Sequence, residues 1–182
     1  MGTKIILNNV IGAYLHLFIA YAKKTGETPK FSMTALINKF DTQAITAIQG
    51  AITKEIKKKG WDASTVYQPL HDGDGLKPKT GEPYPEDFQG CYFLPVSNKE
   101  APCVVDAELR PITDSTLVTF GDTFRLSLDA FTYENSSGRG VSFGLVNVMH
   151  VEKAAPKRRR TPEEDFGVVA VQPENETEDF LQ

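Results

Sequence analysis

Hydrophobic and polar residues alternate along several short stretches of this chain, a pattern typical of β-strands that bury one face. Residues 4–7 and 13–22 are predicted to form the first two strands, which the polar pair Asn8-Asn9 separates. Both faces of the stretch 13–22 are largely apolar, which favours a strand that is covered on both sides in a barrel or a sandwich. The opening of the chain therefore indicates a mainly β body.

Further strands are predicted at residues 30–38, 90–96, 104–109, 122–133 and 141–151. The stretch 122–133 alternates most regularly. One face, expected in the core, carries Phe124, Leu126, Leu128 and Ala130. The other face carries Arg125, Ser127, Asp129, Phe131 and Tyr133. A face that mixes a cation with aromatic rings suits single-stranded nucleic acid, because bases stack on the rings while the cation meets phosphate. Packing of both rings under a loop or in a dimer interface is an equally open alternative.

One helix is predicted, over Thr42–Lys59. Asp41 stands at the N-cap position, and Gly60 follows the last turn. Four isoleucines recur at helical spacing, namely Ile45, Ile48, Ile52 and Ile56. The lysines that precede Gly60 suit the negative end of the helix dipole, which is a stronger explanation for them than contact with DNA.

Residues 61–89 form a long segment that is rich in Pro and Gly, and loops of this length are usually functional or disordered. Within it, Asp72 and Asp74 are close enough to touch one divalent cation, as in a metal-dependent nuclease. The calcium-loop pattern is incomplete here, and Asp-Gly pairs more often make tight turns. Phosphate-loop and hydrolase motifs are absent from the sequence, so no enzyme, metal or cofactor is expected.

The charge distribution divides the chain. The net charge is −4, from 20 basic and 24 acidic residues. Residues 161–182 hold seven of those acids and no Lys or Arg, so the rest of the chain is weakly cationic. A basic run at 157–160 joins the two parts. Such an acidic segment is a candidate competitor for a polyanion groove or a contact for partner proteins, although a solvated end is the simpler alternative. Two cysteines and no leader or membrane-span pattern favour a reducing, cytoplasmic setting.

A series of short motifs between residues 69 and 151 has a distinctive order. The motifs are Pro-Leu-His-Asp-Gly-Asp at 69–74, Phe-Gln-Gly-Cys-Tyr-Phe at 88–93, Val-Val-Asp at 104–106, Gly-Asp at 121–122 and Gly-Val-Ser-Phe-Gly-Leu-Val-Asn-Val at 140–148. In this order they resemble a family of bacteriophage single-stranded DNA-binding proteins, which are similar to the oligonucleotide-binding-fold (OB-fold) proteins of phage replication.

The resemblance implies a mainly β fold: an OB-fold-like five-stranded barrel with one α-helix, a long loop and a disordered acidic C-terminal tail. The expected DNA-binding domain is 1–153, and 154–182 is the basic linker and tail. In this fold Asp72, Gly73 and Asp74 become a structural turn. Phe180, with Glu178 and Asp179, matches the aromatic end of the family's tail, but two further residues follow it.

The resemblance implies a non-enzymatic protein that coats single-stranded DNA in phage replication, recombination or repair, in the cytoplasm of the host cell. Its tail would compete for the DNA groove and recruit replication or recombination proteins. Weak binding to duplex DNA and a homodimer stay open, and no membrane contact is expected. The residues expected to bind DNA are Lys30, Lys77, Lys79, Tyr84, Tyr92, Arg125, Phe131, Tyr133 and Arg139. The alternative is a phage assembly or adaptor protein that uses its β body to bind protein.

Overall fold

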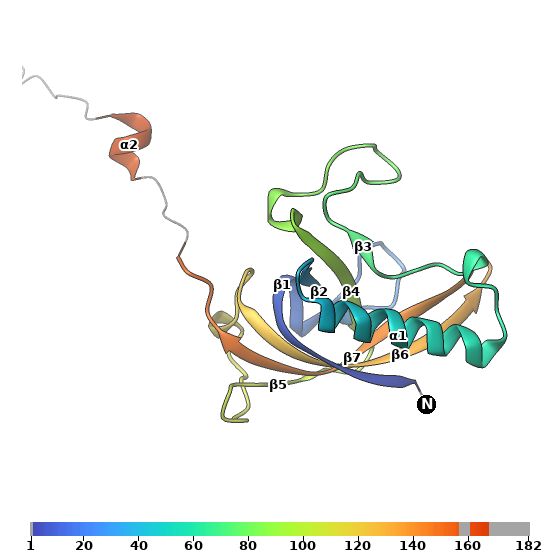
Figure 1. Cartoon of the computed structure of the whole chain (residues 1–182). Coiled ribbons are helices and arrows are strands. Elements are labelled where there is room, and N and C mark those ends of the chain that lie inside the picture. The colour runs from blue at the N-terminus through green and yellow to red at the C-terminus, as the bar shows by residue number, and fades with distance from the viewer. Residues whose placement is uncertain (1, 157–160, 168–182) are drawn as a thin grey trace, which may run out of the picture.

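The computed structural model describes residues 2–156 and 161–167. These residues form a seven-stranded sheet in the order β3-β4-β2-β1-β6-β7-β5, and a long helix lies across it (Figure 1). The strands are β1 (Thr3–Tyr21), β2 (Lys30–Asn38), β3 (His71–Asp72), β4 (Cys91–Asn98), β5 (Cys103–Val105), β6 (Thr123–Asn135) and β7 (Gly138–Glu152). Neighbouring strands pair antiparallel, except that β5 runs parallel to β7.

The predicted mainly β class with one main helix is confirmed, while the strand count differs. β3 and β5 have only two and three residues and lie at the two edges of the sheet. The other five strands of the described chain are longer, and the total of seven exceeds the five that the resemblance implied. The sheet is open, but β4 comes close to β7 where the side-chain amide of Asn98 donates to the carbonyl oxygen of Leu145 at 3.1 Å.

β1 is a single strand, whereas the sequence predicted two. The pairing with β6 shifts register between Leu7 and Val10, and Asn9 has a left-handed backbone with φ of 52°. Such a bulge inserts an extra residue and bends a strand without ending it. Asn tolerates the left-handed region better than most residues, which is why this polar pair can stand inside a strand.

The helix α1 spans Thr42–Lys59, as predicted. The Asp41 side chain accepts a hydrogen bond from the backbone N–H of Ala44, and Gly60 ends the helix with φ of 64°. The buried face of α1 includes Ile48, Ile52 and Ile56, which pack in the main core of the sheet.

The main core lies between α1 and the sheet and is built from alternate residues of the strands. On β6 the predicted core residues Phe124, Leu126, Leu128 and Ala130 are all fully buried. On β2 and β4 the corresponding positions are Met33, Ala35, Ile37, Leu94 and Val96. The residues between them therefore point to the opposite face of the sheet.

The Asp72-Gly73-Asp74 turn is held by an ammonium group. Lys39 Nζ lies 2.6 Å from a carboxylate oxygen of each aspartate. These hydrogen bonds lower the pKa of both carboxyl groups and raise that of Lys39. A Cβ on Gly73 would lie 2.0 Å from the carbonyl oxygen of Phe88, so only glycine fits this position. Among the described residues, no group of three or more potential metal ligands occurs.

Two other segments differ from the predictions. The strand expected over 104–109 is limited to β5, because the Asp106 carboxylate accepts from the backbone N–H groups of Glu108 and Arg110 and closes a turn. Near the chain's end, Pro162–Phe166 forms a short helix, α2, that Thr161 and Glu164 cap reciprocally. None of the helices among the described residues is long and apolar enough to cross a membrane.

Candidate nucleic-acid interface

A groove of about 880 Å³ opens on the face of β1, β2 and β4 that is turned away from α1. Its walls include the turn 22–29 between β1 and β2, and Ser142 of β7 forms part of its border. The middle of the groove consists of small side chains in register: Ser32 is paired with Ser97, and Thr34 with Pro95. Small side chains leave room for an extended ligand chain to lie close to the sheet, and the hydroxyl groups offer hydrogen bonds.

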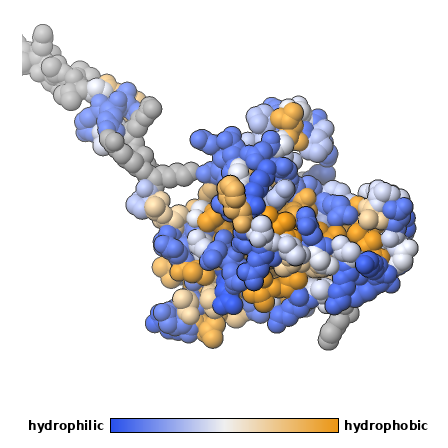
Figure 2. Space-filling model, in the orientation of Figure 1, coloured by the Kyte–Doolittle hydropathy of each residue, from blue (hydrophilic) through white to orange (hydrophobic). Residues whose placement is uncertain are grey.

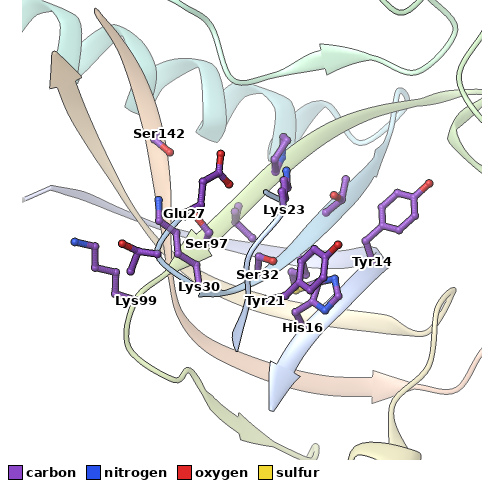
Figure 3. A pocket seen from close by; sticks show the side chains of 15 residues that line it. Tyr14, His16, Tyr21, Lys23, Glu27, Lys30, Ser32, Ser97, Lys99 and Ser142 are labelled. Carbon is purple, nitrogen blue, oxygen red and sulfur yellow. The ribbon is translucent and has the colours of Figure 1, made fainter. Parts of the chain in front are cut away.

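Aromatic rings gather at one side of this groove (Figure 3). The rings of His16 and Tyr21 stack with centroids 4.5 Å apart and an angle of 9° between their planes. Tyr21 remains 51% exposed, so its ring is accessible to a further planar group. Base stacking on an aromatic side chain is worth roughly 1–3 kcal/mol per base. The pair can therefore supply a sequence-tolerant contact to a nucleic acid.

Irregular backbone in β1 places these rings. The pairing with β2 shifts register between Ala13 and His16 and again between His16 and Tyr21. Tyr14 has φ of 50°, which is unusual for an aromatic residue and tends to occur where a fold serves a functional site. Because of these shifts, residues five positions apart can stack on one face of the strand.

The groove carries a net positive charge. Among the described residues that line it, the charged ones are Lys23, Glu27, Lys30 and Lys99. Lys30 is paired with Tyr21 across β1 and β2, and in Figure 3 the side chains of Lys30 and Lys99 extend away from the Tyr21 ring. Lysine ammonium groups bind phosphate as point charges, and counterions released from the nucleic acid favour binding at low salt. Stacking rings and cations therefore line one groove, and these are the two kinds of contact that the bases and phosphates of a single strand need.

A line of ring contacts continues from the groove toward β3. Tyr14 borders the groove, and its ring centroid lies 6.0 Å from that of Phe88. The Phe88 centroid in turn lies 5.1 Å from that of Phe93. His71 follows at 5.0 Å from Phe93, and Tyr67 at 5.7 Å from His71. The Tyr67 hydroxyl and His71 Nε2 are hydrogen-bonded at 2.8 Å. Burial lowers the pKa of His71, so its ring is neutral at neutral pH, and burial also raises the pKa of Tyr67.

Four predicted DNA-binding residues lie at the groove or beside it. Lys30 lines it directly. Phe131 is paired with the groove residue Ser142 and is 42% exposed. Tyr84 meets Phe93 edge-on with centroids 4.8 Å apart. The Tyr133 ring lies over Gly140, where a Cβ would come within 2.6 Å of its hydroxyl oxygen.

The other five lie elsewhere. Tyr92 is on the α1 side of β4, with Lys39 Nζ 5.2 Å from its ring centroid. Arg139 lies 5.2 Å from the Trp61 ring centroid and donates to Thr65. Arg125 donates to Asn8, far along β6 from Phe131. Lys77 lies 3.8 Å from Glu82 in the loop before β4, and Lys79 is exposed in the same loop. The predicted tail contacts Glu178, Asp179 and Phe180 fall outside the described residues.

Several groove residues were not singled out from the sequence: Tyr14, His16, Tyr21, Lys23, Ser32, Thr34, Ser97, Lys99 and Ser142. The stretch 13–22 has apolar residues on both faces, so its sequence pattern indicates an ordinary strand and does not distinguish Tyr14 and His16 as binding residues. The alternation of Ser32 and Thr34 with Met33 and Ala35 was visible, and it marks the face that this strand turns away from the core.

The chain matches a family model described as the ssDNA-binding protein of Enterobacter phage Enc34, over residues 3–181. Since this match covers almost the whole sequence, the chain belongs to that family of phage single-stranded DNA-binding proteins. The resemblance on which the sequence predictions rested is confirmed. A comparison with curated protein sequences finds no match.

Solved structures with similar folds are also phage proteins. The single-stranded DNA-binding protein from bacteriophage Enc34 with a C-terminal truncation has a TM-score of 0.70 at 22% identity, covering 85% of this chain and 88% of that chain. The same phage's protein in complex with ssDNA has a TM-score of 0.70 at 21% identity, covering 84% and 88%. The gp2.5 single-stranded DNA-binding protein encoded by bacteriophage T7 has a TM-score of 0.60 at 13% identity, covering 85% and 94%. At these identities the likeness shows the fold.

Proposed function

We propose that this protein binds single-stranded DNA without catalysis, along the groove on β1, β2 and β4. The observation that supports it most strongly is the stacked pair His16 and Tyr21 in the same groove as Lys30 and Lys99, over a middle of small hydroxyl side chains. Stacking rings and cations together bind the two chemical parts of a single strand without reading its sequence. Family membership supports the same ligand.

The biological role that follows is coating of single-stranded DNA during phage replication, recombination or repair. Sequence-tolerant contacts suit this role because any exposed strand must be covered. In this proposal residues 1–153 form the DNA-binding domain, and 154–182 form a basic linker with an acidic tail. Phe131, Tyr133 and Tyr84 extend the contact surface beyond the groove.

The acidic tail acts as a competitor of DNA in this proposal. Residues 161–182 bring seven acidic residues and no Lys or Arg, while the groove residues are net cationic. Bound DNA would displace the tail and free Glu178, Asp179 and Phe180 to recruit replication proteins. Removing 161–182 is therefore expected to tighten DNA binding and to reduce partner recruitment.

The test is a fluorescence-anisotropy titration of labelled oligo(dT) and of a duplex of equal length, at several salt concentrations. Oligo(dT) is expected to bind more tightly than the duplex. If Lys23, Lys30 and Lys99 each neutralise one phosphate, log K should fall against log salt with a slope of about −2, because single strands contribute roughly −0.7 per contact.

The chain truncated after residue 160 is the control for the tail. Tighter binding by the truncated chain supports competition, and unchanged binding refutes it. If neither chain binds DNA, the β body serves another purpose, and the assembly or adaptor alternative takes its place. In that case, replacing both Phe131 and Tyr133 by Ala should disrupt protein association instead.

A further inference from the structure

A second pocket, of about 650 Å³, lies on the opposite side of the sheet from the groove. It opens between α1 and the chain that turns back after the helix and runs toward β3 (Figure 1). We call it the helix pocket. Its floor is apolar, with Ile52, Ile56 and Leu70, and two rings, Trp61 and Tyr92, border it. On this side of the molecule, hydrophobic and hydrophilic residues are interspersed over the surface (Figure 2).

The polar groups of the helix pocket suit an anionic, planar ligand. None of the described residues that line it is acidic; Gln49 and Gln68 supply amides, and Lys57 supplies an ammonium group. Among the described residues Lys57 has no ion-pair partner, whereas Lys58 pairs with Glu55. The two bordering rings already carry cations: Arg139 lies over Trp61 and Lys39 over Tyr92, each at 5.2 Å from the centroid. Amides, rings and unpaired positive charge together match a nucleobase with its phosphate.

The line of ring contacts leads from the groove to this pocket. It starts at Tyr14 on the border of the groove and ends at Tyr67, and both of these side chains are 54% exposed. The next residue, Gln68, lines the helix pocket. On β4, Phe93 belongs to the ring line while its neighbour Tyr92 borders the pocket. Phe88 and Phe93 in the middle of the line are buried, so Tyr67 is the exposed ring at the β3 end, close to the helix pocket.

We propose that the helix pocket is a second nucleotide-binding subsite, into which single-stranded DNA passes from the groove around the β3 edge of the sheet. The proposal rests on the proposed function of the groove and extends it. A short strand fills the groove alone, while a longer strand passes the exposed ring of Tyr67 and places a base beside Trp61 and a phosphate near Lys57. The footprint of the protein is then larger than the groove.

The experiment compares oligo(dT) of about 4 and about 16 nucleotides, the approximate range of site sizes for such proteins. The full chain has one tryptophan, Trp61, so its emission reports on the helix pocket. The long strand is expected to quench this emission, and the short strand to bind without quenching. The Lys57→Gln variant should lose about 0.7 of the salt slope for the long strand only.

Lys54→Gln is the matched control, because Lys54 lies on the same helix but does not line the pocket. It should leave both salt slopes unchanged. If the long strand binds while Trp61 emission and the Lys57→Gln slope stay unchanged, the subsite is refuted and the groove stands. If neither strand binds, the proposed function itself fails. Quenching by a peptide of residues 174–182, with none by the long strand, would assign the pocket to an acidic peptide instead.

Discussion

The two faces of the β1–β2–β4 part of the sheet differ sharply although the same strands form both. On β2 and β4, Met33, Ala35 and Leu94 are at most 2% exposed and pack in the main core with α1. Their neighbours Ser32, Thr34 and Ser97 are small and polar and line the groove. A strand alternates between its two faces, so one stretch of sequence specifies both a core and a binding surface.

The difference between the faces shows which properties each needs. The core face excludes water and gains stability from buried apolar area. The groove face gives up some of that gain, since it exposes rings such as Tyr21 and carries the lysines Lys30 and Lys99. Substitutions on the core face should therefore change stability, and substitutions on the groove face should change binding.

The largest effect is expected from Leu94→Ala on the core face. Leu94 is fully buried, and deleting such a side chain typically costs about 2–5 kcal/mol of the free energy of unfolding. Thr34→Ala, on the groove face, should cost much less. Urea denaturation of both variants checks this, and similar losses in the two would contradict the division between the faces.

A smaller loss is expected from Asp122→Asn, at a fully buried carboxylate among the apolar core positions. Burial would raise the pKa of Asp122, but hydrogen bonds from the backbone N–H groups of Ala154 and Thr119 and from His150 outweigh it and lower the pKa. The substitution disturbs these hydrogen bonds and should lower the free energy of unfolding by about 1–3 kcal/mol.

The depressed pKa of Asp122 also gives a pH dependence. The ionised carboxylate stabilises the fold fully above the pKa of an unfolded aspartate, about 4. This contribution is lost as the pH falls through the lower pKa that Asp122 has in the folded protein. Between those two pKa values, the free energy of unfolding should fall more steeply with decreasing pH for the wild type than for Asp122→Asn. Identical slopes in that window would mean that Asp122 is not held ionised by the fold.

On the groove face, Tyr21→Ala should weaken oligo(dT) binding by about 1–3 kcal/mol, the value of one stacked base. The matched control is Ile19→Ala, since Ile19 is 80% exposed on the same strand and does not line the groove. Both variants should unfold much like the wild type. If anisotropy titrations show an equal loss of oligo(dT) affinity in both variants, this surface does not stack bases.

The smallest effect is expected from the groove lysines taken singly. Lys30→Gln or Lys99→Gln should make the salt slope less steep by about 0.7, because one phosphate contact is lost. Lys4→Gln, at the far end of β1 and outside the groove, should leave the slope unchanged. A change of the same size in all three would point to general attraction by positive charge.

The sequence predicted the elements with strong local patterns. Regular alternation located β6, and the isoleucine spacing with Asp41 and Gly60 located α1 to the residue. The bulge at Asn9 and the short strand β3 were missed, and the strand predicted at 104–109 proved shorter, because these features depend on pairing with distant strands and on a turn rather than on local alternation. The fold class was predictable, and the detail of the edges was not.

The groove was harder to predict than the core. Lys30, which the sequence predicts to bind DNA, lines the groove. His16 and Tyr21 meet only because two register shifts in β1 turn both rings to one side. Arg125 was chosen from the same alternation as Phe131, yet it donates to Asn8 and lies outside the groove. Alternation shows which face a residue occupies and does not show which part of a long strand borders a site.

Methyl NMR during a titration with oligo(dT) of about 4 nucleotides tests the central claim most directly. Thr34 and Ala35 are adjacent on β2, but Thr34 lines the groove while Ala35 is buried in the core. Stacked bases shift nearby methyl signals through their ring currents. The Thr34 methyl is expected to shift strongly on binding, with little change at Ala35. A bound strand that leaves Thr34 unchanged would place DNA elsewhere on the protein and contradict the assignment of the groove.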